Sequence, residues 1–282
     1  MHSRELGLVL AQQLLDVQDL HYGLWDEDLE LKLSNLPAAQ QRYNDMLFAQ
    51  LPSPGLEVRV LDIGCGAGNL LRQLLDRGYC AEGVIPAKDL CEVTRRRLAG
   101  CPGSPRVFEC RFEDFPVGER GAYYDVALFS ESFQYVSPEV SLPILQAILK
   151  PGGLLLISDF FKTDSVGDGE PGDGSFGGGH PLSEFHASMR RTPFVALKDE
   201  DITRRVSPNM ELVNDLLMNR VRPATLTIGS YLQSRYPWLA RLALALMRRK
   251  IDKLSHKYFS GHRCREVFER YKTYRLMLYR LP

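Results

Sequence analysis

The chain has 282 residues, and its 35 Lys and Arg balance 35 Asp and Glu, a composition typical of a soluble globular protein. No apolar stretch reaches the roughly 18 residues of a membrane span, and the first residues lack the charged-then-apolar pattern of a secretory signal. The six cysteines include no Cys-x-x-Cys pair, which argues against a zinc site and a disulfide framework. We therefore expect a protein of the reducing cytoplasm.

The charges are unevenly distributed along the chain. Residues 204–282 hold 17 Lys or Arg against 5 Asp or Glu, so the rest of the chain is acidic. A basic C-terminal part can meet an anionic partner such as a membrane surface. It can equally form a solvated helical surface that complements the acidic body, and the sequence leaves both interpretations open.

The N-terminal 50 residues predict two helices around a break. Apolar residues recur at helical spacing over 6–20 and again over 37–51. Between these stretches, residues 21–26 read His-Tyr-Gly-Leu-Trp-Asp, and Gly23 with its aromatic neighbours ends the first helix. The break either tucks two aromatic side chains into the core or presents them to a ligand.

Residues 58–69 (Val-Arg-Val-Leu-Asp-Ile-Gly-Cys-Gly-Ala-Gly-Asn) predict a buried strand, a glycine turn and the start of a helix. Glycines let the backbone turn sharply and let a ligand approach, and the helix start offers free N–H groups. The dinucleotide fingerprint would need a glycine at position 69, which is Asn69. No cation stands in the turn to neutralise a pyrophosphate, whereas the Asp62 carboxylate suits a ligand that carries an ammonium and a sulfonium.

Strands and helices alternate through the middle of the chain, which predicts an α/β fold with a largely parallel sheet. After the first strand and its helix at 69–77, the predicted elements are a strand at 80–84, a helix at 87–98, strands at 106–110 and 124–130, a helix at 138–149 and a strand at 154–158.

The last third of the chain carries fewer signals. Residues 164–180 include seven glycines and four acids, so we expect a flexible loop beside the mouth of the site that packs no core. A sixth strand is predicted at 194–197 and a last strand at 273–279, with about 70 mostly helical residues between them. The apolar, cation-tipped stretch 239–250 is either a core-facing helix of a cap or a membrane-surface helix.

Several of these segments resemble landmarks of the class I S-adenosylmethionine (SAM) methyltransferases. Residues 62–68 (Asp-x-Gly-x-Gly-x-Gly) resemble motif I, and residues 149–153 (Leu-Lys-Pro-Gly-Gly) before an apolar strand resemble a second landmark. Residues 130–136 resemble a segment of the tocopherol-type C-methyltransferases. Residues 21–25 resemble the lid segment that packs over the cofactor in small-molecule and isoprenoid-type members.

The resemblance implies an α/β fold with a Rossmann-like, seven-stranded mixed sheet and helices on both faces. It also implies an N-terminal helical lid and a helical insertion before the last strand. The expected parts are a lid (1–51), a SAM-binding core (52–203), a helical substrate cap (204–271) and the last strand of the core sheet (272–282).

The resemblance also implies which residues hold SAM. They are Tyr22, Asp62, Gly64, Cys65, Gly66, Asn69, Ile85, Phe112, Glu113 and Phe129. Two positions depart from the family pattern. Ile85 stands where an acid usually accepts the ribose hydroxyls, and Arg111 stands where an Asp usually binds the adenine amino group. We therefore expect more of the hold on SAM to rest on the glycine turn and the lid.

The reaction implied is methyl transfer from SAM to a small-molecule acceptor, a specialised metabolite, at C, O or N. O-methylation needs a general base, for which His21, His180 and His186 are candidates. C-methylation of an alkene develops a cation, which calls for a carboxylate and aromatic faces such as Glu131 and Tyr22. We expect Glu131, Tyr22 and His180 to be the catalytic residues.

Two other classes of function stay open. The departures at Ile85 and Arg111 fit a protein that binds SAM without methyl transfer, and the basic C-terminal part fits a membrane-associated methyltransferase of an isoprenoid or quinone lipid. We expect no nucleic-acid partner, because no Asn-Pro-Pro-Tyr type motif for a flipped base occurs. We expect no metal, because His180 and His186 stand six positions apart without a cysteine.

Overall fold

A computed structural model describes the chain except for residues 1–18, 20, 56, 104, 239–240 and 242–260. Most of the predicted helix at 6–20 and most of the apolar stretch at 239–250 therefore lie outside the described residues. Within the described part, no helix combines the length and the apolar character needed to cross a bilayer.

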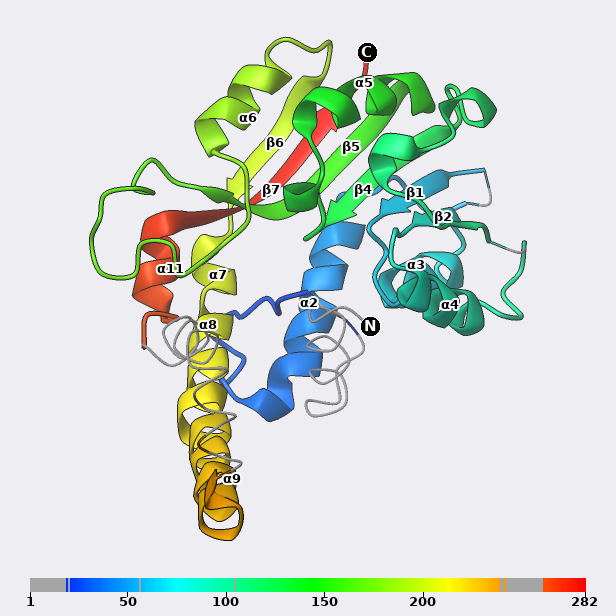
Figure 1. Cartoon of the computed structure of the whole chain (residues 1–282). Helices are drawn as coiled ribbons and strands as arrows, with labels where there is room; N and C mark the ends of the chain where they lie inside the picture. Colours follow the sequence, from blue (N-terminus) through cyan, green and yellow to red (C-terminus); the bar gives the residue numbers. More distant parts are fainter. Residues whose placement is uncertain (1–18, 20, 56, 104, 239–240, 242–260) are drawn as a thin grey trace.

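The strands form one seven-stranded sheet in the order β3-β2-β1-β4-β5-β7-β6 (Figure 1). Strands β3, β2, β1, β4 and β5 pair in parallel, and β7 pairs antiparallel with both β5 and β6. In sheet order the strands are Val107–Phe108, Cys80–Val84, Arg59–Ile63, Tyr124–Ser130, Leu149–Lys162, Lys272–Arg280 and Val195–Asp201. The predicted mixed sheet is confirmed, and β5 extends beyond the predicted 154–158 because nine of its residues pair with β7.

Helices cover both faces of the sheet. They are α2 (Leu36–Phe48), α3 (Asn69–Asp76), α4 (Lys88–Arg97), α5 (Pro138–Ile148), α6 (Leu182–Met189), α7 (Thr203–Val206), α8 (Pro208–Asp215), α9 (Arg222–Arg235) and α11 (Arg265–Tyr271). Short single turns are η1 (Leu33–Asn35), η2 (Phe112–Asp114), η3 (Val117–Glu119) and η4 (Phe133–Tyr135), and the π-helical η5 (Leu216–Val221) joins α8 to α9.

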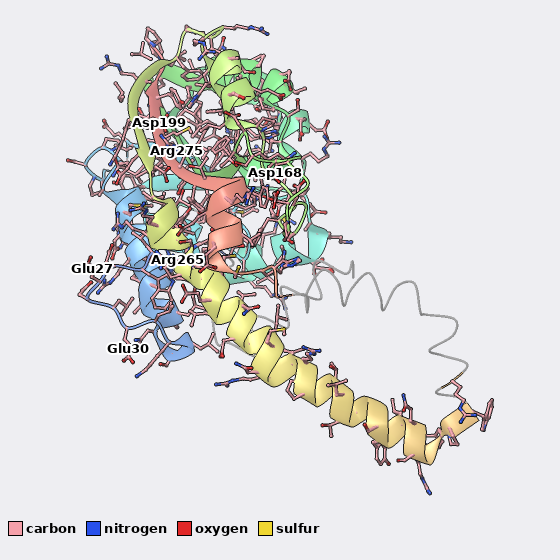
Figure 2. The ribbon with its side chains drawn as sticks, turned by 90° about the vertical axis from the view of Figure 1, so that its left-hand side faces the viewer. Glu27, Glu30, Asp168, Asp199, Arg265 and Arg275 are labelled. Carbon is pink, nitrogen blue, oxygen red and sulfur yellow. The ribbon has the colours of Figure 1, made fainter. Side chains whose placement is uncertain are left out.

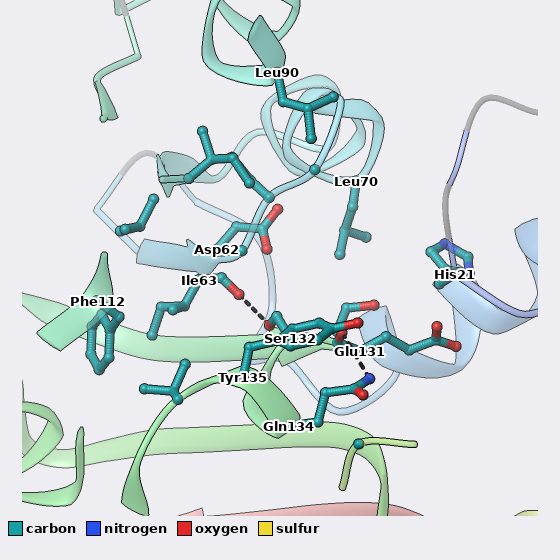
Figure 3. Close-up of a pocket in the computed structure, with 18 of the residues that line it drawn as sticks. His21, Asp62, Ile63, Leu70, Leu90, Phe112, Glu131, Ser132, Gln134 and Tyr135 are labelled. Atoms are coloured by element: carbon teal, nitrogen blue, oxygen red, sulfur yellow. Dashed lines mark hydrogen bonds between the residues drawn. The ribbon is translucent and has the colours of Figure 1, made fainter. Parts of the chain in front are cut away.

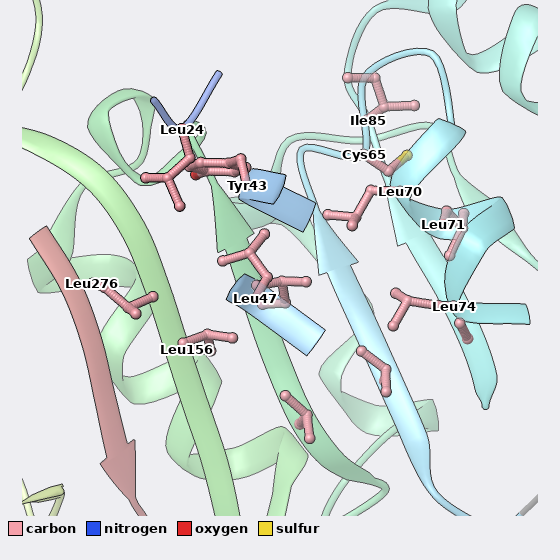
Figure 4. Packing of buried hydrophobic residues seen from close by; sticks show 14 of the residues in the cluster. Leu24, Tyr43, Leu47, Cys65, Leu70, Leu71, Leu74, Ile85, Leu156 and Leu276 are labelled. Atoms are coloured by element: carbon pink, nitrogen blue, oxygen red, sulfur yellow. The ribbon is translucent and has the colours of Figure 1, made fainter. Parts of the chain in front are cut away.

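Two apolar clusters, one on each face, hold the layers together. Adjacent residues of a strand point to opposite faces, so Leu156 packs in the cluster with α2 and α3, while Leu155 packs in the cluster with α5 and α6. Tyr43 and Leu47 of α2 lie over the sheet beside Leu156 (Figure 4). The strands read as nearly continuous apolar runs because a parallel sheet is covered on both faces.

The order in which strands are added to the sheet reverses between β1 and β4: β2 and β3 are added on one side of β1, and β4 is added on the other. Strands β1 and β4 are neighbours in parallel register, with Ile63 opposite Phe129. Ligands of open α/β sheets bind outside the carboxyl ends of the strands at such a switch point. The turns after Ile63 and Ser130 meet at this edge of the sheet.

The predicted helical insertion before the last strand is confirmed. After β6 the chain continues through α7, α8, η5 and α9, and it returns through α11 to β7. Helix α9 projects away from the body (Figure 2).

The expectation that the glycine-rich segment 164–180 packs no core is wrong. Phe176 lies against Phe268 of α11, with ring centroids 5.2 Å apart. Asp168 Oδ2 accepts a hydrogen bond of 2.8 Å from Arg270, and Lys272 Nζ donates one of 2.5 Å to the carbonyl oxygen of Gly178. The segment is thus held against α11 and β7 by an aromatic contact and by polar contacts, which glycine content alone does not reveal.

Candidate functional site

A cavity of about 880 Å³ opens at the carboxyl ends of β1, β2 and β4. Its walls come from the turn after β1, the segment after β4, the N-terminal segment around His21, and the glycine-rich segment with α11. Figure 3 shows Asp62, His21 and Glu131 around this space. The cavity therefore lies at the switch point of the sheet.

The glycine turn packs against the start of the segment after β4. Gly64, Gly66 and Gly68 all have positive φ, at 84°, 55° and 79°, a region that side chains disfavour. A Cβ on Gly64 would lie 2.3 Å from the Cβ of Ser132, whose hydroxyl donates a hydrogen bond to the carbonyl oxygen of Ile63. The turn thus needs glycine for its own packing as well as for the approach of a ligand.

Asp62 brings an unpaired carboxylate oxygen to the cavity. The side chain is 1% exposed, and its Oδ2 accepts no hydrogen bond from any described residue. Burial, together with the nearby Asp19 carboxylate, raises the pKa of Asp62 to about 7, and the His21 cation opposes this shift. A buried carboxylate in this state gains most from a ligand that supplies a positive charge and N–H donors.

An ion pair on the N-terminal segment faces the same space. His21 Nδ1 lies 2.8 Å from the carbonyl oxygen of Tyr22, which can only accept, so Nδ1 carries a proton. Its Nε2 lies 3.5 Å from Asp19 Oδ2. Burial lowers the pKa of His21, but the neighbouring Asp19 carboxylate has the larger effect, so the pKa of His21 is raised. Burial also raises the pKa of Asp19, but the interaction with His21 outweighs this effect, so the pKa of Asp19 is lowered.

Amide side chains fix this segment to three helices. Asp19 Oδ2 accepts hydrogen bonds from Asn69 Nδ2 of α3 at 2.7 Å and from Asn44 Nδ2 of α2 at 3.0 Å. Asn209 of α8 accepts from the indole Nε1 of Trp25 at 3.0 Å. Trp25 is buried there and does not line the cavity, so the expectation that it lines the pocket is wrong and the core interpretation holds for it.

Glu131 occupies a strained position directly after β4. Its φ of 53° places a non-glycine residue in the left-handed region, which costs about 1–3 kcal/mol. Its Oε1 accepts hydrogen bonds of 2.8 Å from the backbone N–H of Tyr22 and from the hydroxyl of Tyr274. Burial raises the pKa of Glu131, whereas His21, the Tyr22 N–H and the Tyr274 hydroxyl oppose this shift.

The far end of the cavity contains both departures from the family pattern. Ile85, at the end of β2, gives an apolar wall, and no carboxylate stands at this position. Arg111 Nη2 and Glu113 Oε1 form an ion pair of 3.1 Å, and the side chain of Phe112 is buried. Glu113 is therefore already engaged by Arg111 instead of standing free for a ligand.

The structure brings most of the predicted site residues to the cavity wall. Those that line it are Tyr22, Asp62, Gly64, Cys65, Gly66, Asn69, Ile85, Phe112, Glu113 and Glu131. Phe129 lies beneath the site, where its ring packs against Phe112 and Phe133 at 5.6 and 5.1 Å. His180 Nε2 lies 3.1 Å from the carbonyl oxygen of Phe133, outside the lining.

The remaining candidate base, His186, also lies apart from the cavity, with Nε2 3.1 Å from Asp199 Oδ2. Among the described residues, no group of three or more His, Cys, Asp or Glu is placed to hold a metal ion. Sequence reasoning missed three aromatic wall residues, namely Phe160, Phe176 and Phe268. Phe176 is the one aromatic residue within a run of glycines and acids, which is a usable signal.

Comparison with known proteins assigns part of the cavity wall to a recognised domain. Residues 60–153 match the family described as methyltransferase domain. The chain is 30% identical over 115 residues to sterol 4-C-methyltransferase of Caenorhabditis elegans, which is 38% of this chain and 32% of the nematode protein. It spans between 32% and 47% of the length of five curated relatives that it matches.

Solved structures share the whole fold at low identity. A geranyl diphosphate methyltransferase in complex with GPP and sinefungin matches with a TM-score of 0.70 and 17% identity, covering 97% of this chain and 94% of that one. The 4+2 cyclase SpnF matches with a TM-score of 0.66 and 20% identity, covering 99% and 94%. At these identities the similarity shows the fold alone.

The packing of the glycine turn predicts the effect of adding one methyl group. We expect Gly64→Ala to lower the free energy of unfolding by more than the roughly 1–2 kcal/mol of left-handed strain, because its Cβ also meets Ser132. Gly152→Ala is the matched control, since Gly152 has a φ of 80° and no atom within 4 Å of an added Cβ. Urea unfolding of both variants measures the difference, and equal losses would contradict the packing argument.

Proposed function

We propose that this chain, which contains a class I SAM-dependent methyltransferase domain, transfers a methyl group from SAM to a small-molecule acceptor. The observation that carries the proposal is the unpaired, buried Asp62 carboxylate beside the glycine turn, inside the matched domain. The sterol and geranyl diphosphate methyltransferases among its relatives and structural neighbours support an acceptor with a large hydrocarbon part.

The residues present fit SAM at its amino-acid end. Asp62 Oδ2 would accept from the ammonium of its methionine part, and the turn at Gly64 and Gly66 leaves room beside it. Phe112 and Glu113 would border the adenine, and Ile85 would offer the ribose an apolar contact in place of an acid. When bound, SAM supplies a methyl group on a positively charged sulfur.

The acceptor side of the cavity favours methylation at carbon. The aromatic side chains Phe160, Phe176 and Phe268 line the cavity, and aromatic rings can stabilise a positive charge that develops beside them. Among the described residues, His21 is the histidine that lines the cavity, but its Nδ1 proton is held by the Tyr22 carbonyl and its Nε2 lies 3.5 Å from Asp19 Oδ2, so both ring nitrogens face protein groups. Glu131 is therefore the residue we assign to remove a proton from the acceptor.

The division into parts stays a proposal. We infer a lid at 1–51, a SAM-binding core at 52–203, a cap at 204–271 and a last core strand at 272–282. Arg263 and Phe268 of the cap range line the cavity, which supports a role of this range in selecting the acceptor.

The state of Asp62 predicts a pH-dependent affinity for SAM. The carboxyl must be ionised to pair with the ammonium, and its pKa in the free protein is about 7. We expect SAM to bind roughly tenfold more weakly at pH 6 than at pH 7.5, because one proton must leave before binding. Isothermal titration calorimetry measures both affinities.

The control for this prediction is Asp62→Asn, which keeps the shape but does not ionise. We expect it to bind SAM more weakly with no such dependence on pH between 6 and 7.5. We also expect it to raise the free energy of unfolding of the free protein at pH 8 by about 1–3 kcal/mol, since an unpaired buried charge is removed. A wild-type affinity in Asp62→Asn would overturn the assignment of the cavity.

The reaction itself is tested with Glu131→Gln. Gln keeps an acceptor oxygen for the Tyr22 N–H but cannot take a proton, so we expect turnover to fall at least about a hundredfold while the affinity for SAM changes little. The assay follows label from methyl-labelled SAM into products of a host extract. A wild-type protein that binds SAM and yields no labelled product would instead favour a role without methyl transfer; one structural neighbour is a 4+2 cyclase.

A second candidate is a membrane-associated methyltransferase of an isoprenoid or quinone lipid. Residues 216–238 contain three arginines and no acid. Exposed apolar side chains gather on α9 and just beyond it, namely Leu226, Ile228, Tyr231, Leu232, Tyr236 and Trp238. The spacing of residues 228, 231 and 232 places them along one stripe of α9, which ends at Arg235. Apolar and aromatic side chains with arginines suit the surface of an anionic bilayer.

We expect the double variant Tyr231→Ser, Trp238→Ser to bind anionic vesicles at least about tenfold more weakly than wild type in a flotation assay at low salt. The control variant Val195→Ser, Leu197→Ser removes two apolar side chains from β6, each 47% exposed, and should float like wild type. Wild-type protein that stays unbound, or equal losses in both variants, would count against a membrane-binding α9.

A further inference from the structure

We propose that Tyr274 is a positioning residue that fixes the Glu131 carboxylate for proton removal, with Tyr43 supporting it from behind. The inference rests on the proposed function and adds residues that lie outside the matched domain and outside the cavity lining. Because Tyr274 acts on the ionisation of Glu131, its role can be tested by measuring the pKa of Glu131 without measuring turnover.

Hydroxyl groups from three elements converge behind Glu131. The Tyr274 hydroxyl, on β7, donates to Glu131 Oε1 at 2.8 Å, and its oxygen lies 2.9 Å from the hydroxyl of Tyr43 on α2. Tyr43 in turn lies 2.8 Å from Ser158 Oγ on β5. The Tyr43 hydroxyl donates to Ser158 Oγ, and its oxygen lies within hydrogen-bond distance of the Tyr274 hydroxyl. Both tyrosines are fully buried, so their positions are set by packing.

Both hydrogen bonds to the Glu131 side chain end on the same oxygen. Oε1 accepts from Tyr274 and from the Tyr22 N–H, whereas Oε2 accepts from no described residue. Since the side chain lines the cavity, Oε2 is the oxygen left for the acceptor. The two donors therefore fix the orientation of the carboxylate through Oε1 and leave Oε2 free to contact the substrate.

The surroundings of Glu131 make these donors necessary. The ionisable groups that face it are His21, Tyr22, Tyr43, Tyr274 and Asp159. Burial raises the pKa of Asp159 to about 8, so that neighbouring carboxyl is largely neutral at pH 7. Burial also raises the pKa of Glu131 itself, and the His21 cation, the Tyr22 N–H and the Tyr274 hydroxyl oppose it. Loss of the Tyr274 donor shifts this balance towards a protonated Glu131, which cannot act as a base.

Methylation of an alkene carbon followed by proton loss to Glu131 depends on this arrangement. The π electrons of the acceptor form a bond to the methyl carbon, while the electron pair of the methyl–sulfur bond returns to sulfur. A C–H bond next to the resulting cation then gives its proton to Glu131 Oε2 and its electron pair to a new double bond. Glu131 must be ionised before the step and is neutral after it, so its pKa sets the pH at which the step occurs.

The test measures the Glu131 pKa directly, by carboxyl ¹³C NMR of the full chain labelled at glutamate. The resonance is assigned by its absence from Glu131→Gln. In Tyr274→Phe we expect the pKa of Glu131 to rise by about one unit or more, because a hydrogen bond to the ionised form is lost. In Tyr43→Phe we expect a smaller rise.

Tyr279→Phe is the matched control. Tyr279 lies on the same strand, is buried on the opposite face of the sheet, and its hydroxyl contacts only Met277 Sδ, at 3.5 Å. We expect no change in the Glu131 pKa there. An unchanged pKa in Tyr274→Phe would overturn the inference, as would an equal rise in Tyr279→Phe.

Activity then separates this inference from the proposed function. If Glu131 is the base, the acidic limb of the rate profile of Tyr274→Phe moves to higher pH with the NMR value, and the KM for SAM changes little. A shifted pKa together with wild-type turnover in Glu131→Gln would support the positioning role and refute the role of Glu131 as base.

Discussion

One carboxylate oxygen, Glu131 Oε1, joins three parts of the chain that are distant in sequence. It accepts from the backbone of Tyr22 in the N-terminal segment and from Tyr274 of the last strand, 143 positions away. The residue that carries this oxygen has a left-handed φ, so the surrounding contacts must offset its strain. The shape of the cavity at this point depends on the junction, because the same two contacts join the N-terminal segment and the last strand to the residue after β4.

Of the described acidic side chains around the cavity, one lacks a positively charged or hydrogen-bonding partner. Asp19 is offset by His21, Glu113 by Arg111, and Glu131 by two donors. Asp62 has no such partner among the described residues. An electrostatic requirement of this kind selects a cationic ligand without any contact to its remaining atoms, which explains how SAM can be bound although the usual ribose and adenine acids are replaced.

The sequence predicted the fold well because each signal was local. Apolar runs located the strands, and the glycine turn located the site, since the residues that define these features are neighbours in the chain. Contacts between distant segments could not be predicted in this way. The contacts of Trp25 with Asn209, of Phe176 with Phe268, and of Tyr43 with Tyr274 form only when the fold brings these distant segments together. An aromatic residue in a loop or a tyrosine in a strand carries no mark of such a partner.

The place of β7 in the sheet has a consequence for the order in which the molecule assembles. This strand follows every other described element in the chain, yet it lies between β5 and β6 and is antiparallel to both. During synthesis β6 therefore has no neighbour until residues 272–280 emerge from the ribosome, and Glu131 lacks its tyrosine donor for the same period. The cavity therefore reaches its final geometry only after β7 has paired with β5 and β6, and until then the sheet has an open edge that can pair with another chain.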